Sequence, residues 1–175
     1  NTALSQGVAV DATTGETLWV FNPKSYEEGT TPMSGTFVQR GVAYWTDGED
    51  DERIFWGTGN GYLVCVQAKT GQPCPDFGPD GSGMVDAMVG LPRAIREDRD
   101  YLNALLYGIH SPPIVVRDRV IHGSQVADRR ITKEAVPGWV RAWNVRTGEH
   151  SWDFHTVPNS ADEFGADTWL NKKAD

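Results

Sequence analysis

Arg40, Asp128 and Trp169 are the side chains of this sequence with the most specific binding chemistry. A guanidinium binds a carboxylate through two parallel hydrogen bonds, an aspartate oxygen binds a hard divalent cation, and an indole offers a flat stacking surface. Each also has an ordinary interpretation. Arg40 could be a surface-loop arginine, and Trp169 could be a packing residue. Asp128 precedes Arg129-Arg130 and could be an ion-pair partner of little energetic value.

An internal repeat indicates the elements that position these side chains. Three segments align on a Thr-Gly pair that ends at Gly15, Gly71 and Gly148, and an apolar strand precedes each pair. Four residues beyond the glycines stand Trp19, Pro75 and Trp152, and six residues beyond stand Phe21, Phe77 and Phe154. Each copy is predicted to be a β-hairpin whose turn glycine has a positive φ and whose aromatic residues share one face. We expect Trp19 and Trp152 to pack.

The fold class predicted from this repeat is all-β, because hairpins with one apolar face must stack to bury it. The glycines are 56 and 77 residues apart, which exceeds the roughly 40 to 50 residues of a propeller blade and leaves room for insertions. Further strands are expected at 42–45, 53–56, 114–116 and 120–122. Residues 1–175 are therefore predicted to form a partial β-propeller of about three blades, each a four-stranded antiparallel sheet, with an insertion near 78–108.

Charge and hydropathy exclude some classes of partner. The net charge of −8, without any cluster of basic residues longer than a pair, argues against nucleic acid. No apolar run approaches the about 20 residues that cross a bilayer, so no transmembrane segment is expected in this chain. No phosphate loop, Gly-x-Ser-x-Gly elbow or dinucleotide fingerprint is present.

Other polar features have plainer interpretations. The acidic run at 48–52 is predicted to be a solvated hairpin tip, and the Asp- and Gly-rich stretch at 76–86 lacks the alternating acids of an EF-hand loop. Cys65 and Cys74 have neither zinc-knuckle nor Cys-x-x-Cys spacing. Because they flank a predicted turn, they are either a disulfide on adjacent strands or two separate thiols.

A repeat and three further stretches of the sequence resemble one family of enzymes. The repeat Ala-x-x-x-Thr-Gly-x-x-x-Trp resembles the tryptophan docking motif of pyrroloquinoline quinone (PQQ) dependent dehydrogenases of the glucose and alcohol dehydrogenase type. The run from Gln39 to Trp45, Gln-Arg-Gly-Val-Ala-Tyr-Trp, is similar to the segment in which that family binds a quinone carboxylate. Residues 111–128 and 164–169 resemble a metal-binding strand pair and a segment with a stacking tryptophan. The resemblance runs nearly end to end and implies a piece of an eight-bladed propeller.

The resemblance also implies a set of site residues and cofactors. It implies that PQQ is bound with Ca²⁺ or Mg²⁺ and that Asp128 is a metal ligand. The cofactor-binding residues it implies are Arg40, His110, Gln125, Ala127 and Trp169. The catalytic base, an aspartate in the family, is expected outside this chain, so the catalytic residues are unknown and the isolated chain is expected to be inactive.

The implied parent enzyme is periplasmic, either free or associated with the membrane, and oxidises a sugar or alcohol hydroxyl with a quinone or cytochrome as electron acceptor. Ser34 and Gly35 stand where the alcohol enzymes have two adjacent cysteines, which favours the glucose branch. Two alternatives remain. One is a non-catalytic propeller that acts as a protein-interaction scaffold, and the other is a small β protein that pairs its open edges with another copy.

Overall fold

The computed structural model describes residues 1–27, 39–91, 95–96, 99–100, 107–126, 137–158 and 160–168. Its regular elements are short strands and two single 3₁₀ turns. In chain order they are β1 (Gly7–Val10), β2 (Thr17–Phe21), β3 (Ala43–Thr46), β4 (Glu52–Gly57), β5 (Tyr62–Gln67), η2 (Pro79–Gly81), β6 (Met84–Asp86), β7 (Ile95–Arg96), β8 (Arg99–Asp100), β9 (Tyr107–Gly108), β10 (Ile114–Val116), β11 (Arg119–His122), β12 (Gln125–Val126), β13 (Val140–Asn144), β14 (His150–Phe154) and η3 (Ala166–Thr168). Within these residues no helix has the length and apolar character needed to cross a membrane.

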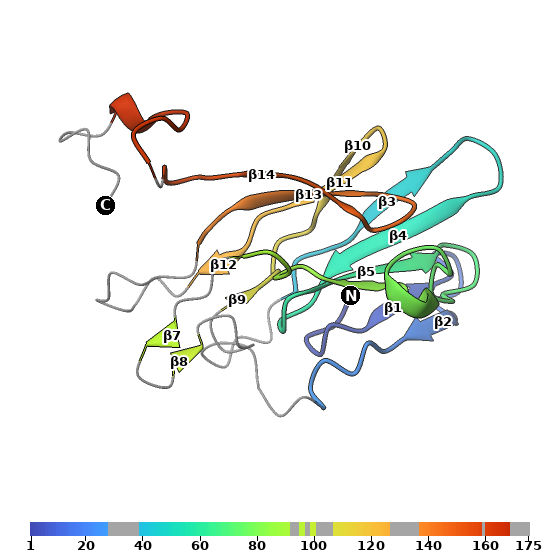
Figure 1. Cartoon of the computed structure of the whole chain (residues 1–175). Coiled ribbons are helices and arrows are strands. Elements are labelled where there is room, and N and C mark those ends of the chain that lie inside the picture. The colour runs from blue at the N-terminus through green and yellow to red at the C-terminus, as the bar shows by residue number, and fades with distance from the viewer. Residues whose placement is uncertain are drawn as a thin grey trace.

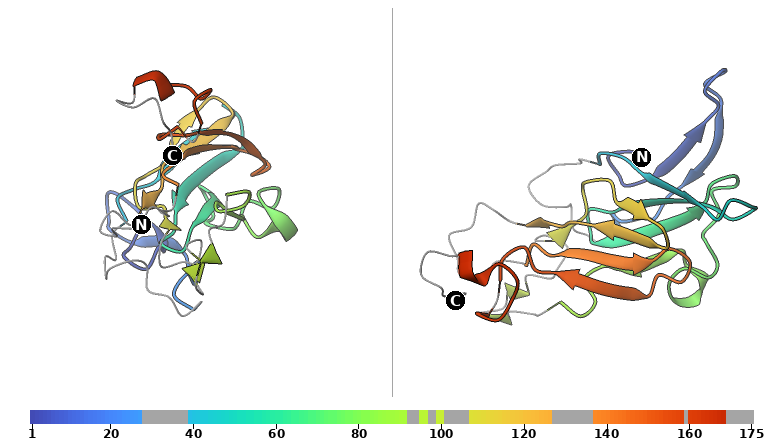
Figure 2. Two further views of the ribbon diagram at one scale, coloured as in Figure 1. Left: turned by 60° about the vertical axis from the view of Figure 1, so that its left-hand side comes forward. Right: turned by 90° about the horizontal axis from the view of Figure 1, so that it is seen from above.

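Two four-stranded antiparallel sheets form the body of the chain (Figure 1). The strands of the first sheet have the order β3-β4-β5-β6 and those of the second have the order β10-β11-β13-β14, so the first strand of each sheet in chain order lies at one edge of that sheet. The hairpin β1–β2 lies on the side of the first sheet away from the second, as both views of Figure 2 also show. This arrangement confirms the predicted all-β fold with four-stranded antiparallel sheets.

The three Thr-Gly turns have the same geometry, as the repeat predicts. In each, the glycine N–H donates to the carbonyl four residues earlier, at 2.8 Å for Gly15, 2.9 Å for Gly71 and 3.0 Å for Gly148. Their φ angles are +76°, +68° and +70°, a region that favours glycine. The threonine hydroxyl accepts from the backbone N–H two residues later in all three copies, at 3.2 Å. The turn is therefore determined locally by the sequence.

The second copy departs from the expected hairpin after its glycine. The strand with alternating aromatics does not form there, and only Pro73 bridges back to Val66. The chain instead makes a loop closed by a disulfide between Cys65 and Cys74, whose Cα atoms are 5.6 Å apart. Because the loop occupies these residues, the fourth strand of the sheet is β6, which lies inside the interval predicted to be an insertion.

The apolar core lies between the successive sheets. A large cluster joins the two four-stranded sheets, and a smaller one, built on Trp56, Val64 and Val66, joins the first sheet to the β1–β2 hairpin. Trp19 packs in the smaller cluster, as predicted. Trp152 was expected to pack in the same way, but it is 42% exposed because no described segment covers it.

Candidate functional site

The segments that lead into β3 and β10, the first strands of the two sheets, form the candidate site. Arg40 lies just before β3 and His110 lies shortly before β10, so they occupy corresponding places in the two sheets. The Arg40 N–H donates to the His110 carbonyl oxygen at 3.1 Å. The two chain segments are in close contact, since a Cβ on Gly41 would lie 3.4 Å from the Pro112 side chain. The structure therefore brings together two predicted site residues that are 70 positions apart in the sequence.

His110 is a buried, neutral imidazole at this site. Its side chain is 7% exposed and lies against Gly108, where a Cβ would come within 2.9 Å of the imidazole Nε2. Burial, with a smaller contribution from the positive charge of Arg40, lowers the pKa of His110. The ring is therefore uncharged near pH 7 and can donate or accept a hydrogen bond.

Arg40 is exposed, and among the described residues no carboxylate forms an ion pair with it. Its backbone N–H is held by the His110 carbonyl oxygen. This donor set fits a ligand carboxylate, because an arginine fork binds both carboxylate oxygens.

The short ribbon of β9 and β12 brings a third predicted residue to the same place. Gln125 pairs with Gly108 through the backbone, next to His110. Sequence reasoning missed two buried hydroxyls beside this ribbon, on Tyr107 and Ser124, because neither belongs to a motif. Neither hydroxyl oxygen has a hydrogen-bond partner of normal geometry among the described residues. Burial raises the pKa of Tyr107 to about 12, against smaller lowering effects of nearby Arg141 and the Ser124 hydroxyl.

The remaining predicted site residues lie outside the described residues. These are Ala127, Asp128 and Trp169, together with the side chain of Gln125, and their roles stay predictions. Within the part of the chain that the structure describes, no group of three His, Cys, Asp or Glu side chains could hold a metal ion.

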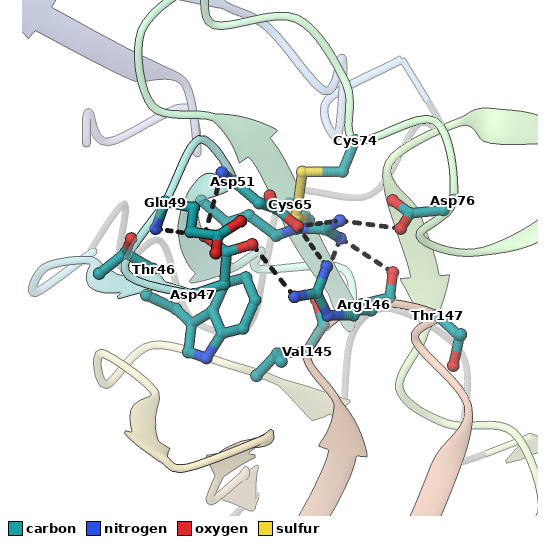
Figure 3. Close-up of polar contacts among 12 residues, drawn as sticks. Thr46, Asp47, Glu49, Asp51, Cys65, Cys74, Asp76, Val145, Arg146 and Thr147 are labelled. Atoms are coloured by element: carbon teal, nitrogen blue, oxygen red, sulfur yellow. Dashed lines mark hydrogen bonds and ion pairs between the residues drawn. A yellow bond between two sulfur atoms is a disulfide. The ribbon is translucent and has the colours of Figure 1, made fainter.

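A second charged cluster, shown in Figure 3, has a structural role. Arg53 pairs with Asp51 and Asp76, each at 2.8 Å, and Arg146 pairs with Asp51 at 2.9 Å and Asp47 at 3.3 Å. The prediction of a solvated hairpin tip agrees with residues 48–50, which are exposed in the turn between β3 and β4, whereas Asp51 is only partly exposed and pairs with both arginines. These arginines are already paired, whereas Arg40 has no carboxylate partner among the described residues.

Comparisons with known proteins agree with this architecture. All 175 residues match the family model described as the glucose/ethanol/alcohol dehydrogenase β-propeller domain, named PQQ. The chain is 30% identical over 154 residues to quinohemoprotein alcohol dehydrogenase ADH IIB of Pseudomonas putida, covering 88% of this chain and 18% of that protein. It is also 30% identical over 172 residues to quinoprotein glucose dehydrogenase A of Acinetobacter calcoaceticus, covering 89% of this chain and 20% of that protein.

Among solved structures, the quinohemoprotein alcohol dehydrogenase of Comamonas testosteroni has the same fold. Its TM-score is 0.63 at 22% identity, with 91% of this chain and 19% of that chain covered. The chain thus spans about a fifth of the length of the relatives it matches.

Proposed function

The chain belongs to the PQQ family of glucose/ethanol/alcohol dehydrogenase β-propeller domains, and from that premise we propose that it forms one side of a PQQ site. The whole protein would then be a quinoprotein oxidoreductase that oxidises a sugar, glucose-like, or an alcohol hydroxyl. When bound, PQQ supplies the two-electron acceptor for that oxidation.

The observation that carries this proposal is the backbone contact between Arg40 and His110, just before β3 and β10. PQQ is a flat tricarboxylate, so its site needs a cation that can bind a carboxylate with directional hydrogen bonds. Arg40 supplies that cation from an exposed position without a carboxylate partner among the described residues. His110, held neutral by burial, supplies a hydrogen bond without adding a second charge.

The other proposed contacts follow the family resemblance. Gln125 and Ala127 would border the cofactor, Trp169 would stack on its ring, and Asp128 would be one oxygen ligand of Ca²⁺ or Mg²⁺. Because Ca²⁺ takes about six to eight oxygen ligands, further ligands must come from elsewhere. The base that accepts the substrate proton is expected outside this chain.

The Cys65–Cys74 disulfide supports a periplasmic location, because disulfides persist in oxidising compartments. In that compartment a quinone or a cytochrome would accept the electrons. The rival proposal, a non-catalytic scaffold that binds other proteins, gives no role to the exposed guanidinium of Arg40.

The test is a PQQ titration, with and without Ca²⁺, of the natural protein that includes this chain. Arg40→Ala should weaken PQQ binding at least about tenfold, and Arg40→Lys should recover only part of it because a lysine lacks the planar fork. The matched control is Arg119→Ala, which removes a partly exposed arginine at the start of β11.

Reduction of an artificial electron acceptor is followed in the same samples with glucose and with ethanol as substrates. PQQ-dependent reduction with either substrate would support the dehydrogenase. Absence of PQQ binding, or equal binding by Arg40→Ala and wild type, would overturn the proposal in favour of the scaffold.

A further inference from the structure

The segment that carries Arg40 is held by residues from the first six positions of the chain. The Gln39 side-chain amide donates to Ser5 Oγ at 3.3 Å. The Asn1 side-chain amide donates to the Gly41 carbonyl at 3.2 Å. Both neighbours of Arg40 are thus fixed from one side, while the Arg40 N–H is fixed by His110 from the other.

The Ser5 hydroxyl also reaches the second half of the candidate site. Its oxygen accepts from the Gly59 N–H at 3.3 Å, in the turn that follows β4. The Gly59 carbonyl lies so near Gly108 that a Cβ there would be 2.8 Å away, and the same Cβ would meet the His110 ring. One hydroxyl oxygen therefore connects the segment of Arg40 with the segment that supports His110.

Ser5 is held in a conformation that serines seldom adopt. Its φ is +61°, its side chain is nearly inaccessible, and the residue is 2% exposed. Its carbonyl accepts from the Trp56 indole N–H at 2.8 Å, and its own N–H donates to Thr2 at 3.0 Å. Glycine would be the easier residue for such a backbone. A serine there keeps a hydroxyl at the cost of a less favourable φ.

We propose that Ser5 is a positioning residue for Arg40, which rests on the proposed PQQ site. The Arg40 guanidinium lies at the end of a long, exposed side chain. Its position relative to a ligand carboxylate therefore depends on how firmly the Arg40 backbone is held. Without the Ser5 hydroxyl, the Gln39 side chain keeps only its 3.5 Å contact with the Asn1 amide, and the Gly59 N–H loses the oxygen that accepts its hydrogen bond. The arginine then has more conformational freedom to lose on binding, and cofactor affinity falls.

The experiment measures the dissociation constant of PQQ, by quenching of intrinsic fluorescence, in the natural protein that includes this chain. Ser5→Ala should weaken binding about fivefold to tenfold, the size expected for one lost hydrogen-bonding group. Ser5→Gly should weaken it equally, although it relieves the positive φ. Because the two variants share only the loss of the hydroxyl, equal effects assign the result to that group.

A double-mutant cycle with Arg40→Ala separates positioning from general stability. If Ser5 acts through Arg40, then Ser5→Ala should not weaken PQQ binding further in the Arg40→Ala protein. The inference is overturned if Ser5→Ala leaves PQQ affinity unchanged, or if Ser5→Gly has full affinity. It is also overturned if Ser5→Ala causes the same loss of affinity in the wild-type protein and in the Arg40→Ala protein. If Arg40→Ala itself leaves PQQ affinity unchanged, the proposed site fails instead.

Discussion

The two interfaces between successive sheets are built from different chemistry. In the hairpin interface, where β1–β2 packs on the first sheet, the contacts are aromatic. Trp56 meets Phe21 edge to face at 5.9 Å, and its side chain fills the space above Gly7. The main polar contacts are indole N–H groups that donate to carbonyls, such as Trp19 to Ala68 at 2.9 Å.

In the sheet interface, between the two four-stranded sheets, buried arginines reach in both directions. Arg53 extends from β4 and donates to the carbonyls of Val145 at 3.2 Å and Arg146 at 2.9 Å. Arg141 extends from β13 in the opposite direction and donates to the Ala87 carbonyl, while its Nε is 2.6 Å from Asp153. Both arginines are less than a tenth exposed.

This difference between the two interfaces follows from the residue that stands four positions after the glycine of each Thr-Gly turn. At the hairpin interface, Trp19 of one copy lies against Gly71 of the next, where a Cβ would be only 2.5 Å from the indole. The next copy has Pro75 at that position, and the turn that follows the disulfide-closed loop instead brings Phe77 to within 3.3 Å of the Cβ position on Gly148. Equivalent Thr-Gly turns can thus pack either against a tryptophan or against a disulfide-closed segment that has arginine–aspartate ion pairs beside it.

The largest effect on stability is expected from removing the main aromatic side chain of the hairpin interface. Trp56→Ala should lower the free energy of unfolding by about 3 to 5 kcal/mol, because it leaves a cavity and removes the donor to Ser5. Urea unfolding of the purified protein measures this change. Trp56→Phe is the control, since it keeps much of the apolar contact and should cost clearly less. Equal losses would mean that the indole hydrogen bond, and not packing, dominates this interface.

The next largest effect is expected from removing one arginine of the sheet interface. Arg53→Met keeps much of the side-chain volume but leaves the carbonyls of Val145 and Arg146 without their donor, at a cost of about 3 kcal/mol. Lys69→Met, which breaks the exposed ion pair with Glu52, is the control and should leave urea unfolding unchanged. A neutral Arg53→Met would show that apolar packing alone joins the two sheets.

Removal of the disulfide should weaken the same interface through the loop. The Cys65→Ala/Cys74→Ala variant opens a loop of about ten residues, for which chain entropy predicts a loss of about 2 to 3 kcal/mol. Phe77, fully buried in the intact protein, should become a site of chymotrypsin cleavage. Persistent protection of Phe77 in the variant would mean that the sheet interface holds this loop without the disulfide.

Acidification should also act on the second sheet, through His122. Its Nε2 accepts from the Trp143 indole N–H at 2.9 Å, and burial is the main reason that its pKa falls from 6.5 to about 4. The unfolded state therefore binds more protons between these values, and stability is lost as the pH falls from about 6.5 towards about 4.

At pH 5 this loss should be about 2 kcal/mol relative to pH 7, as measured by urea unfolding. The control is His122→Gln, which has a side-chain oxygen in place of the imidazole acceptor but does not titrate. The pH dependence between 5 and 7 should be smaller in that variant. An unchanged pH profile would place the acid sensitivity on other groups.

The sequence by itself determined the repeated turns and most of the strands. Each Thr-Gly turn depends on hydrogen bonds between residues at most five apart, and each strand on alternating side chains with Gly, Pro or Asp at its ends. Local interactions of this kind can be predicted without knowledge of the fold. The internal repeat then indicated the fold class, and the resemblance of other segments to a known family named Arg40 and His110 as site residues.

Only the tertiary structure decided which distant groups meet. The disulfide remained open in the sequence because two cysteines nine residues apart can pair only if the chain brings their Cα atoms close together, which here is done by a loop and not by the expected second strand. The ion pairs of Asp51, the loop that replaces an expected strand, and the contact of Ser5 with the segment of Arg40 all depend on neighbours that sequence spacing does not specify. Such contacts join residues separated by about 30 to 90 positions, and packing of the sheets, rather than any local pattern, brings them within hydrogen-bonding distance.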